Sequence, residues 1–228
     1  KMYTMDDEDE DVLEYDLVCP FNIIEGKCPE ITKGDRTGLA IAQIEVATRT
    51  IEHSTDTALN RLKWIRRNKD NQNLTNLNLD FNFTNQMLAS LTKAVKTSAG
   101  KKNKNKQQDV FYWSEGSIAV GRIGDTSIAS TRKIGTEAIT VGADKFTNNN
   151  GIKGLAFRVG RNDVDIGSAG SNLDTDTYNL TYYTTSPVEG GSKFIDTVVG
   201  IGKLSSDLLT VLDGKNLTAD RTGEQIYG

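Results

Sequence analysis

The sequence of 228 residues is poor in apolar side chains. Hydrophobic residues make up 36% of it, whereas soluble domains of this size carry about 45–50%. The mean hydropathy is -0.46, and no apolar run approaches the roughly 20 residues that a membrane-spanning helix needs. A helical membrane protein is therefore excluded. The chain is either not one compact globule, or its interior is not apolar.

Other scarce features exclude further classes of function. The net charge of -4 and the pI of 5.2 disfavour a nucleic-acid binder of the basic kind. The single histidine, His53, leaves a zinc or haem site with few ligands, and we expect it on a helix surface. No GxSxG elbow occurs, and a catalytic triad would have to use His53. We therefore expect no enzyme activity, no metal, no cofactor and no small-molecule substrate.

The first part of the chain, residues 1–38, is acidic and irregular, and we interpret it as a tail or linker. Its start lacks the basic and apolar regions of a signal peptide. Cys19 and Cys28 flank a loop with proline and glycine, so they are candidates for a disulfide in an oxidising compartment. Two unpaired thiols are the alternative.

Residues 39–67 have the spacing of an amphipathic helix, with Ile44 and Leu62 on one apolar stripe. The end of this helix is basic, as suits the negative end of a helix dipole. The basic residues are Arg61, Lys63, Arg66 and Arg67, and they surround Trp64; we single out Arg61, Trp64, Arg66 and Arg67 as candidate pore-helix residues. Residues 68–110 are rich in Asn, Lys and Gln, which is typical of a polar linker, and 85–95 are predicted to form a short helix within it.

From residue 111 onward, the hydrophobic period changes to two. Apolar residues alternate with polar or small ones in segments 136–144, 152–163, 175–185 and 193–204, less cleanly in 111–123, and again from about Thr222. This alternation predicts strands with one apolar face. Such strands occur in soluble sandwiches and in outer-membrane barrels, so further observations must separate the two.

Three observations favour the barrel. The predicted connections at 124–135, 146–151, 164–174, 186–192 and 208–221 alternate long and short, as in outer-membrane barrels. Aromatic residues gather at the strand ends on the short-turn side, which is typical of an interfacial girdle; these are Tyr112, Trp113, Phe146, Tyr182 and Phe194. Charges occur on the apolar faces only near strand ends, and a mid-membrane Lys or Arg facing lipid costs about 2–4 kcal/mol.

We therefore predict an all-β fold, an antiparallel up-and-down transmembrane β-barrel of which 111–228 supply about six strands, preceded by the amphipathic helix. A polar lumen would also explain the low apolar content. The predicted lipid-facing residues are Ile139, Val141, Leu155, Phe157, Val159, Leu180, Val199 and Ile201. The predicted lumen-facing residues are Glu115, Asp144, Arg158, Asn179 and Asp196.

The second half of the sequence resembles the translocator domain of bacterial autotransporters (type V secretion). The resemblance runs from about Ile41 to the C-terminus. It rests on the order and spacing of WSEGSIAVGRIGD at 113–125, TVGAD at 140–144, GLAFRVGRNDVD at 154–165, DTYNLTYY at 176–183 and GEQIYG at 223–228. The LKWIRR segment at 62–67 also looks like the helix that precedes such barrels.

The resemblance implies a 12-stranded barrel in the bacterial outer membrane, with a helix in its lumen, that exports an N-terminal passenger to the cell surface. It implies outer-membrane lipid, the passenger and the barrel-assembly machinery as partners. The helix arginines would then pair with carboxylates of the lumen. The sequence departs from the family in two ways. Adjacent asparagines occur only at 148–150, away from the helix where some relatives cleave themselves, and Gly228 stands where an aromatic residue usually ends the barrel.

Two further expectations complete the interpretation. Six strands are half of twelve, so we expect a passenger tail, a pore helix and half a barrel, and we expect the isolated fragment to aggregate because its sheet edges are open. The alternative function is a soluble β-rich binding or adhesion domain with acidic loops. Asp163, Asp165, Asp174 and Asp176 flank one such loop and would suggest calcium, but they lack the spacing of a known calcium loop, which favours exposed loop carboxylates.

Overall fold

The computed structural model describes residues 2–5, 12–15, 33–68, 70–71, 73–77, 82–99, 110–188, 193–212 and 215–228. The chain divides into two compact units, Lys1–Lys33 and Gly34–Gly228. In the first unit, β1 (Met2–Met5) and β2 (Val12–Tyr15) pair as an antiparallel hairpin. The sequence was expected to be irregular here, so this hairpin corrects the prediction for part of residues 1–38.

The long helix α1 spans Lys33–Arg67, with Asp35 in its first turn and Arg66 and Arg67 in its last, as the helix dipole favours. It begins at Lys33 rather than at the predicted residue 39. The extra turn is held from outside, because the Ser130 backbone N–H donates to the Gly34 carbonyl (3.1 Å). Tertiary contact therefore extends the helix through two glycines that propensity alone disfavours.

The second helix, α2, spans Gln86–Ala99, close to the short helix predicted at 85–95. Asn85 caps its N-terminus, because the Asn85 Oδ1 accepts hydrogen bonds from the backbone N–H groups of Met87 (3.0 Å) and Leu88 (3.2 Å). In the part of the chain that the structure describes, neither helix combines the length and the apolar character needed to cross a membrane.

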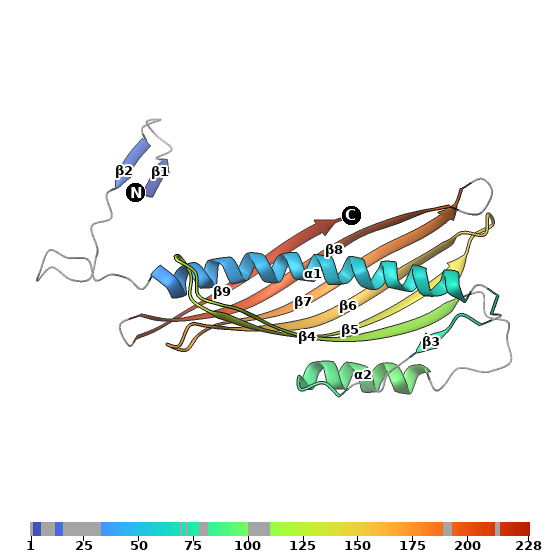
Figure 1. Cartoon of the computed structure of the whole chain (residues 1–228), viewed down its shortest axis with the longest axis horizontal. Helices are drawn as coiled ribbons and strands as arrows, with labels where there is room; N and C mark the ends of the chain where they lie inside the picture. The colour runs from blue at the N-terminus through green and yellow to red at the C-terminus, as the bar shows by residue number, and fades with distance from the viewer. Residues whose placement is uncertain are drawn as a thin grey trace, which may run out of the picture. The chain divides into compact units, whose positions relative to one another are not determined.

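The sheet contains seven strands in the order β3-β4-β5-β6-β7-β8-β9 (Figure 1). Six of them form an up-and-down antiparallel meander, as predicted. They are β4 (Phe111–Ile123), β5 (Arg132–Phe146), β6 (Ile152–Ile166), β7 (Ser171–Pro187), β8 (Phe194–Leu212) and β9 (Lys215–Tyr227). The two-residue β3 (Asn76–Leu77) pairs in parallel with the outer edge of β4, so the sheet is mixed.

The predicted alternation of long and short connections is wrong. The strands continue through much of the segments expected to be loops, and the connections are 124–131, 147–151, 167–170, 188–193 and 213–214. The reason is that polar residues in these segments also pair in register, for example Asp163 with Asp174. A transmembrane strand needs about 9–11 residues, so strands of 15 to 19 residues such as β6 and β8 exceed the lipid-facing length.

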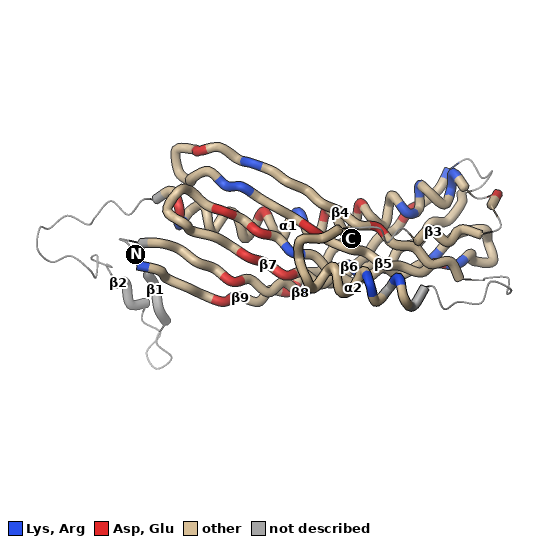
Figure 2. The backbone as a smooth tube through the Cα atoms, turned by 90° about the horizontal axis from the view of Figure 1, so that it is seen from below, with Lys and Arg blue, Asp and Glu red and all other residues tan. Residues whose placement is uncertain are grey.

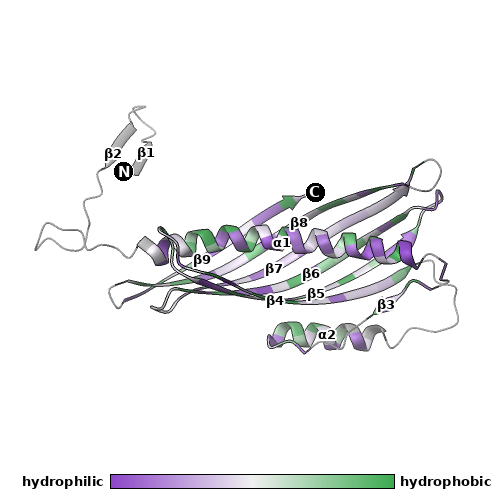
Figure 3. Ribbon diagram, viewed as in Figure 1, coloured by the Kyte–Doolittle hydropathy of each residue, from purple (hydrophilic) through white to green (hydrophobic). Residues whose placement is uncertain are grey.

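The two helices lie on opposite faces of the sheet (Figure 1). Along α1, two apolar clusters join the helix to the sheet, one around Leu62 and Trp113 and one around Val46 and Val164. A third cluster joins α2 to the other face through Leu88. Figure 3 shows hydrophilic and hydrophobic residues mixed along α1, as expected for a helix that packs on a partly polar surface.

An acidic row crosses the outer face, meaning the face that does not contact α1. Asp163, Asp174, Asp207 and Asp220 are register partners across four adjacent strands, β6 to β9. Acidic residues recur along β7, β8 and β9 in Figure 2. Like charges directly opposite each other are unfavourable in a sheet and untenable in hydrocarbon. This row therefore marks a part of the sheet that needs water.

Candidate functional site: the helix and the polar face of the sheet

The strongest polar contact between α1 and the sheet is the ion pair of Arg61 with Asp144. The Arg61 Nε donates to Asp144 Oδ2 (2.8 Å) and its Nη2 donates to Oδ1 (3.1 Å). The two side chains are 3% and 1% exposed. The Tyr183 hydroxyl donates to the same carboxylate (2.8 Å), and the Trp113 Nε1 donates to that hydroxyl (2.7 Å). Asp144 thus accepts from the helix and from the sheet together.

Two indole rings surround the Arg61 guanidinium. Its Cζ lies 4.8 Å from the ring centroid of Trp64 and 5.8 Å from that of Trp113. Within the described residues, its Nη1 is buried and has no hydrogen-bond partner. An aromatic face attracts a cation at these distances. The rings therefore offset part of the cost of that missing hydrogen bond.

Further polar contacts fix α1 along its length. Towards the β4–β5 connection, Arg132 Nη2 pairs with Glu45 Oε1 (2.9 Å). Near the middle, Asn179 Nδ2 donates to Ser54 Oγ (2.6 Å) and Thr57 Oγ1 donates to Glu115 Oε1 (3.3 Å). At its C-terminal end, Arg66 Nη1 pairs with Asp196 Oδ1 (2.8 Å) and lies 5.4 Å from the Phe194 ring as measured from its Cζ. The helix is therefore positioned by specific pairs and not only by apolar packing.

Aromatic rings on the same face lie over glycines of neighbouring strands. A Cβ on Gly142 would come within 2.3 Å of the Trp113 ring, and one on Gly154 within 2.4 Å of the Tyr183 ring. Tyr227 covers Gly200 in the same way. Because glycine has no side chain, each ring can pack directly against the backbone of the next strand. The Trp113 and Tyr183 rings also meet edge to face, with centroids 6.2 Å apart.

The structure places all five predicted lumen residues on the face that α1 covers. They are Glu115, Asp144, Arg158, Asn179 and Asp196. The strand pairing puts their side chains on the same face of the sheet as the residues that contact α1. Glu115 takes Thr57 as its hydrogen-bond partner from α1, not an arginine. Arg158 is buried and donates within the sheet, to Thr140 Oγ1 (3.3 Å) and Ser117 Oγ (3.0 Å). Arg67, predicted to belong to the pore-facing group, is exposed.

The predicted aromatic girdle needs correction. Four of its five residues lie at strand ends near the 147–151 and 188–193 connections, but Tyr182 lies five residues before the end of β7 and Trp113 is buried against α1. Phe194 lies under Arg66 of α1, and Phe146 packs edge-on against the inner residue Phe111 with ring centroids 5.7 Å apart. Of the five, only Tyr112 and Tyr182 share the outer face by register. Alternation explains this, since Trp113 is two residues from Glu115 and must share its face.

The predicted lipid-facing residues all lie on the outer face, because the strand pairing puts their side chains on the same side of the sheet as Val141. Leu155, Phe157, Leu180, Val199 and Ile201 are exposed, and Val141 is half-buried. Ile139 and Val159 differ, because α2 buries them. An exposed apolar face on a folded sheet of this size indicates an interaction with another apolar phase.

Three other features from the sequence remain to be located: the two cysteines, the acidic residues beside a loop and possible metal ligands. Cys19 and Cys28 lie outside the described residues. The acidic residues predicted to flank a loop lie in strands β6 and β7, on either side of the 167–170 connection, and Arg161 pairs there with Asp174 (3.4 Å) and Asp176 (3.5 Å). Among the described residues, no group of three or more His, Cys, Asp or Glu side chains is placed to hold a metal ion.

Residues 112–228 match the family model of the autotransporter beta-domain. The chain belongs to this family. No curated protein and no solved structure matches it. The autotransporter domain is an outer-membrane β-barrel and part of a protein-transport system, and its family is one of translocators, not of enzymes. Membership explains why the apolar face points outward and the polar face meets α1.

Sequence reasoning missed several residues that position α1 in this autotransporter domain. Glu45 and Ser54 bond across the interface, and Tyr183 donates within the sheet to the carboxylate of Asp144 that holds Arg61; none of the three was singled out. A signal was present, because Ser54 and Thr57 interrupt the apolar stripe of the helix at spacings that place them on its buried side. Polar residues inside such a stripe predict polar partners opposite them.

Proposed function

We propose that this autotransporter domain anchors an N-terminal passenger in the outer membrane and exports it to the cell surface, with α1 as the helix that connects the two through the pore. One observation carries the proposal. The sheet has a polar face bound to α1 through the buried Arg61–Asp144 pair, and an apolar face exposed on the other side. This is the inverse of a soluble sandwich, whose apolar faces meet inside.

The direction of α1 supports the orientation. Its first turn lies at the end of the sheet that carries the 124–131 and 167–170 connections, as the Ser130–Gly34 hydrogen bond indicates. Its last turn lies at the opposite end, beside Asp196. A passenger that precedes α1 in the chain would then emerge at the first end of the sheet. The barrel strand β4 begins at the second end. We assign the first end to the cell surface and the second to the periplasm.

The acidic row on the outer face agrees with this assignment. It lies toward the proposed surface end of β6 to β9, beyond the apolar rows, and would stand in water or among headgroups. The proposal keeps the predicted order of a passenger tail or linker, a pore helix, a linker at 68–110 and barrel strands at 111–228, with the pore helix now starting at Lys33 and the linker containing α2. The soluble binding domain is not favoured, because the chain's family is one of translocators.

The test is export in living cells. The 228-residue chain would be directed to the periplasm with an epitope at its N-terminus, and intact cells would be treated with an external protease. We expect the epitope to be digested while the strands fractionate with outer membranes, and we expect both results to be lost when the barrel-assembly machinery is depleted. An epitope that stays protected in a membrane-bound chain would contradict export alone. A chain recovered in the soluble periplasm would contradict the anchor as well.

A further inference from the structure

Helix α2 covers part of the outer face of the sheet. Its apolar side and the segment before it pack on the strands through Leu88 and Phe83, which are 0% and 7% exposed. Beneath them lie Ile139 of β5 and Val159 of β6, each 3% exposed. Apart from these two, the predicted lipid-facing residues are exposed or half-buried.

The covered surface is continuous with the exposed apolar surface. Ile139 and Val159 are register partners, and the next outward row on the same strands is Val141 with Phe157, which continues to Leu180. Phe157 and Leu180 are more than 40% exposed. The charged row of Glu137 and Arg161 lies on one side of Ile139 and Val159. On the other side, toward Val141 and Phe157, the apolar surface continues from under α2 without a charged row between them. The same occupant therefore suits both.

The outward side of α2 is unsuited to lipid. Gln86, Ser90, Lys93 and Thr97 are exposed on it, opposite the buried Leu88. A lysine that faces hydrocarbon at mid-membrane costs about 2–4 kcal/mol, falling toward zero near the interfaces. A helix held in this position within a bilayer would present a row of polar side chains to acyl chains. The helix and the lipid are therefore alternative occupants of one surface.

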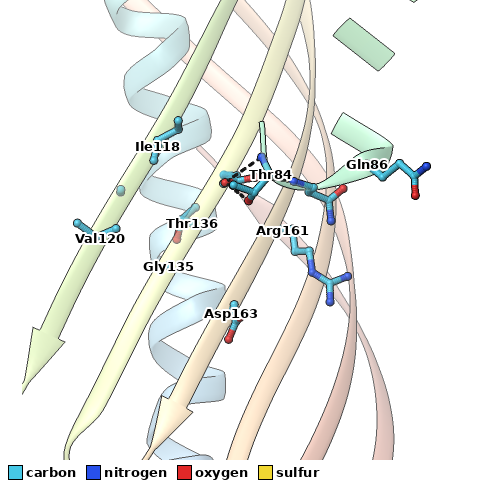
Figure 4. Close-up of a pocket in the computed structure, with 11 residues that line it drawn as sticks. Thr84, Gln86, Ile118, Val120, Gly135, Thr136, Arg161 and Asp163 are labelled. Carbon is cyan, nitrogen blue, oxygen red and sulfur yellow. Dashed lines mark hydrogen bonds between the residues drawn. The ribbon is translucent and has the colours of Figure 1, made fainter. Parts of the chain in front are cut away.

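Polar contacts hold the N-terminal end of α2 in place. The Glu137 carboxylate of β5 accepts hydrogen bonds from the backbone N–H groups of Thr84 (3.4 Å) and Asn85 (3.1 Å) and from the Thr84 hydroxyl. Arg161 of β6 is the direct register partner of Glu137. Both line a surface pocket of about 530 Å³ beside α2, in which Figure 4 places Thr84, Gln86 and Arg161. Arg161 already pairs with Asp174 (3.4 Å) and Asp176 (3.5 Å), so the described contacts of the Glu137 carboxylate are those with the α2 end.

We propose that α2 is a displaceable cover over a lipid-binding surface, and that acyl chains replace it when the sheet enters a bilayer. Glu137 acts as the latch of this cover, because its carboxylate binds the N-terminal end of α2. The inference rests on the proposed function, since it requires the outer face to meet lipid. Continuity of the covered surface with the exposed apolar rows identifies acyl chains as the occupant.

Cross-linking tests the displacement. The full chain would carry Leu88→Cys and Val159→Cys together with Cys19→Ser and Cys28→Ser, and would be treated with a short cleavable bismaleimide in buffer and after mixing with short-chain phosphatidylcholine vesicles. An uncharged lipid surface avoids attraction through Lys93. We expect efficient cross-linking in buffer and at least a tenfold loss in vesicles. A pair with Ala89→Cys in place of Leu88→Cys is the control, because Ala89 is exposed and should cross-link poorly in both.

Flotation of the vesicles separates the possible failures. A chain that floats with the vesicles and still cross-links overturns the cover while leaving the membrane function intact. A chain that never floats overturns the membrane function and the cover together. Absence of cross-linking in buffer, together with unprotected hydrogen exchange of α2 in the chain that keeps Leu88 and Val159, also overturns the cover. If α2 is cross-linked to β6 before lipid is added, the strands should not enter the vesicles and should stay sensitive to protease. Cleaving the cross-link should restore their protection.

The latch makes a separate prediction. Glu137→Gln keeps the size of the side chain but removes the charge that binds the two N–H groups, and charge-assisted hydrogen bonds are about twice as strong as neutral ones. We expect vesicle association of this variant to be about fivefold faster, the effect of losing about 1 kcal/mol from the covered state. Glu224→Gln, on the same face of β9, is the control and should leave the rate unchanged. Equal rates for both variants and the unmodified chain would overturn the latch.

Discussion

The two helices of this autotransporter domain use opposite chemistry on opposite faces of one sheet. Helix α1 meets the sheet through ion pairs and hydrogen bonds, with Arg61, Ser54 and Thr57 buried beside apolar residues. Helix α2 meets it through Leu88 and neighbouring apolar side chains, and the Glu137 carboxylate binds its N-terminal end.

The difference shows how each contact responds to its surroundings. A paired charge shielded from water and lipid keeps its partner, because separating the two leaves both uncompensated. An apolar contact between a helix and a sheet loses most of its driving force in lipid, because acyl chains solvate both surfaces. The contacts of α1 are therefore suited to persist in a membrane, whereas those of α2 are stable only in water.

The largest expected effect comes from breaking the α1 contact at its centre. Asp144→Ala leaves the Arg61 guanidinium buried without its anion and removes the acceptor of the Tyr183 hydroxyl. Removing one partner of a buried pair costs about 3–5 kcal/mol. We expect this loss in the free energy of unfolding in detergent, measured by urea titration, with faster hydrogen exchange along α1 and unchanged exchange in α2.

Two variants control this result. Asp207→Ala removes a carboxylate from the acidic row of the outer face and should change the free energy of unfolding by less than about 0.5 kcal/mol. The double substitution Arg61→Leu with Asp144→Leu should recover most of the stability, because it removes both charges from the interior. Equal loss in the single and double variants would mean that packing, not charge, holds α1.

The second effect addresses α2. Leu88→Ala removes the most deeply buried side chain of this helix, and such truncations cost about 2–5 kcal/mol in a closed core. We expect about 2 kcal/mol here, since α2 contacts the sheet on one side only and can resettle. Hydrogen exchange in buffer should rise in α2 and stay unchanged in α1. Ala94→Ser, on the exposed side of α2, is the control.

The third effect tests the close fit of the inner face. Gly142→Ala brings a methyl group within 2.3 Å of the Trp113 ring, which must move and which contacts α1. Overpacking of this kind costs about 1–3 kcal/mol. Gly135→Ala, a glycine of the same strand on the outer face, has its nearest neighbour at 3.9 Å and should be tolerated. Thermal unfolding in detergent would measure both. A larger loss at Gly135 would contradict the assignment of the close fit to the inner face.

Much of this arrangement could be predicted from period-two alternation. The six strands, their antiparallel order and the preceding helix follow from patterns that depend on local sequence and burial alone. The prediction of the aromatic girdle was wrong where it relied on residue type and not on this alternation. Trp113 was assigned by its residue type to the membrane interface, although its spacing from Glu115 requires the inner face.

Other features depend on contacts that sequence patterns do not record. The start of α1 is set by Ser130, which lies in a connection nearly a hundred residues away. The position of α2 depends on a capping carboxylate, Glu137, that belongs to a different element. The strand lengths were underestimated because polar pairs such as Asp163 with Asp174 extend a sheet as well as apolar pairs do. Long-range contact, not local preference, decided each of these.

The smallest expected effect is at the C-terminal end of α1. Arg66 and Asp196 pair at 2.8 Å, but their side chains are 24% and 23% exposed. Solvent screens such pairs, and their measured coupling is about 0.2–1 kcal/mol. A double-mutant cycle with Arg66→Ala and Asp196→Ala in detergent should give a coupling in this range that falls as salt is raised. A coupling as large as that of Arg61 with Asp144, insensitive to salt, would mean that this end of α1 is also closed to water. The helix would then be held by charge from its centre to its end, and the contrast with α2 would be stronger than the exposure of this pair indicates.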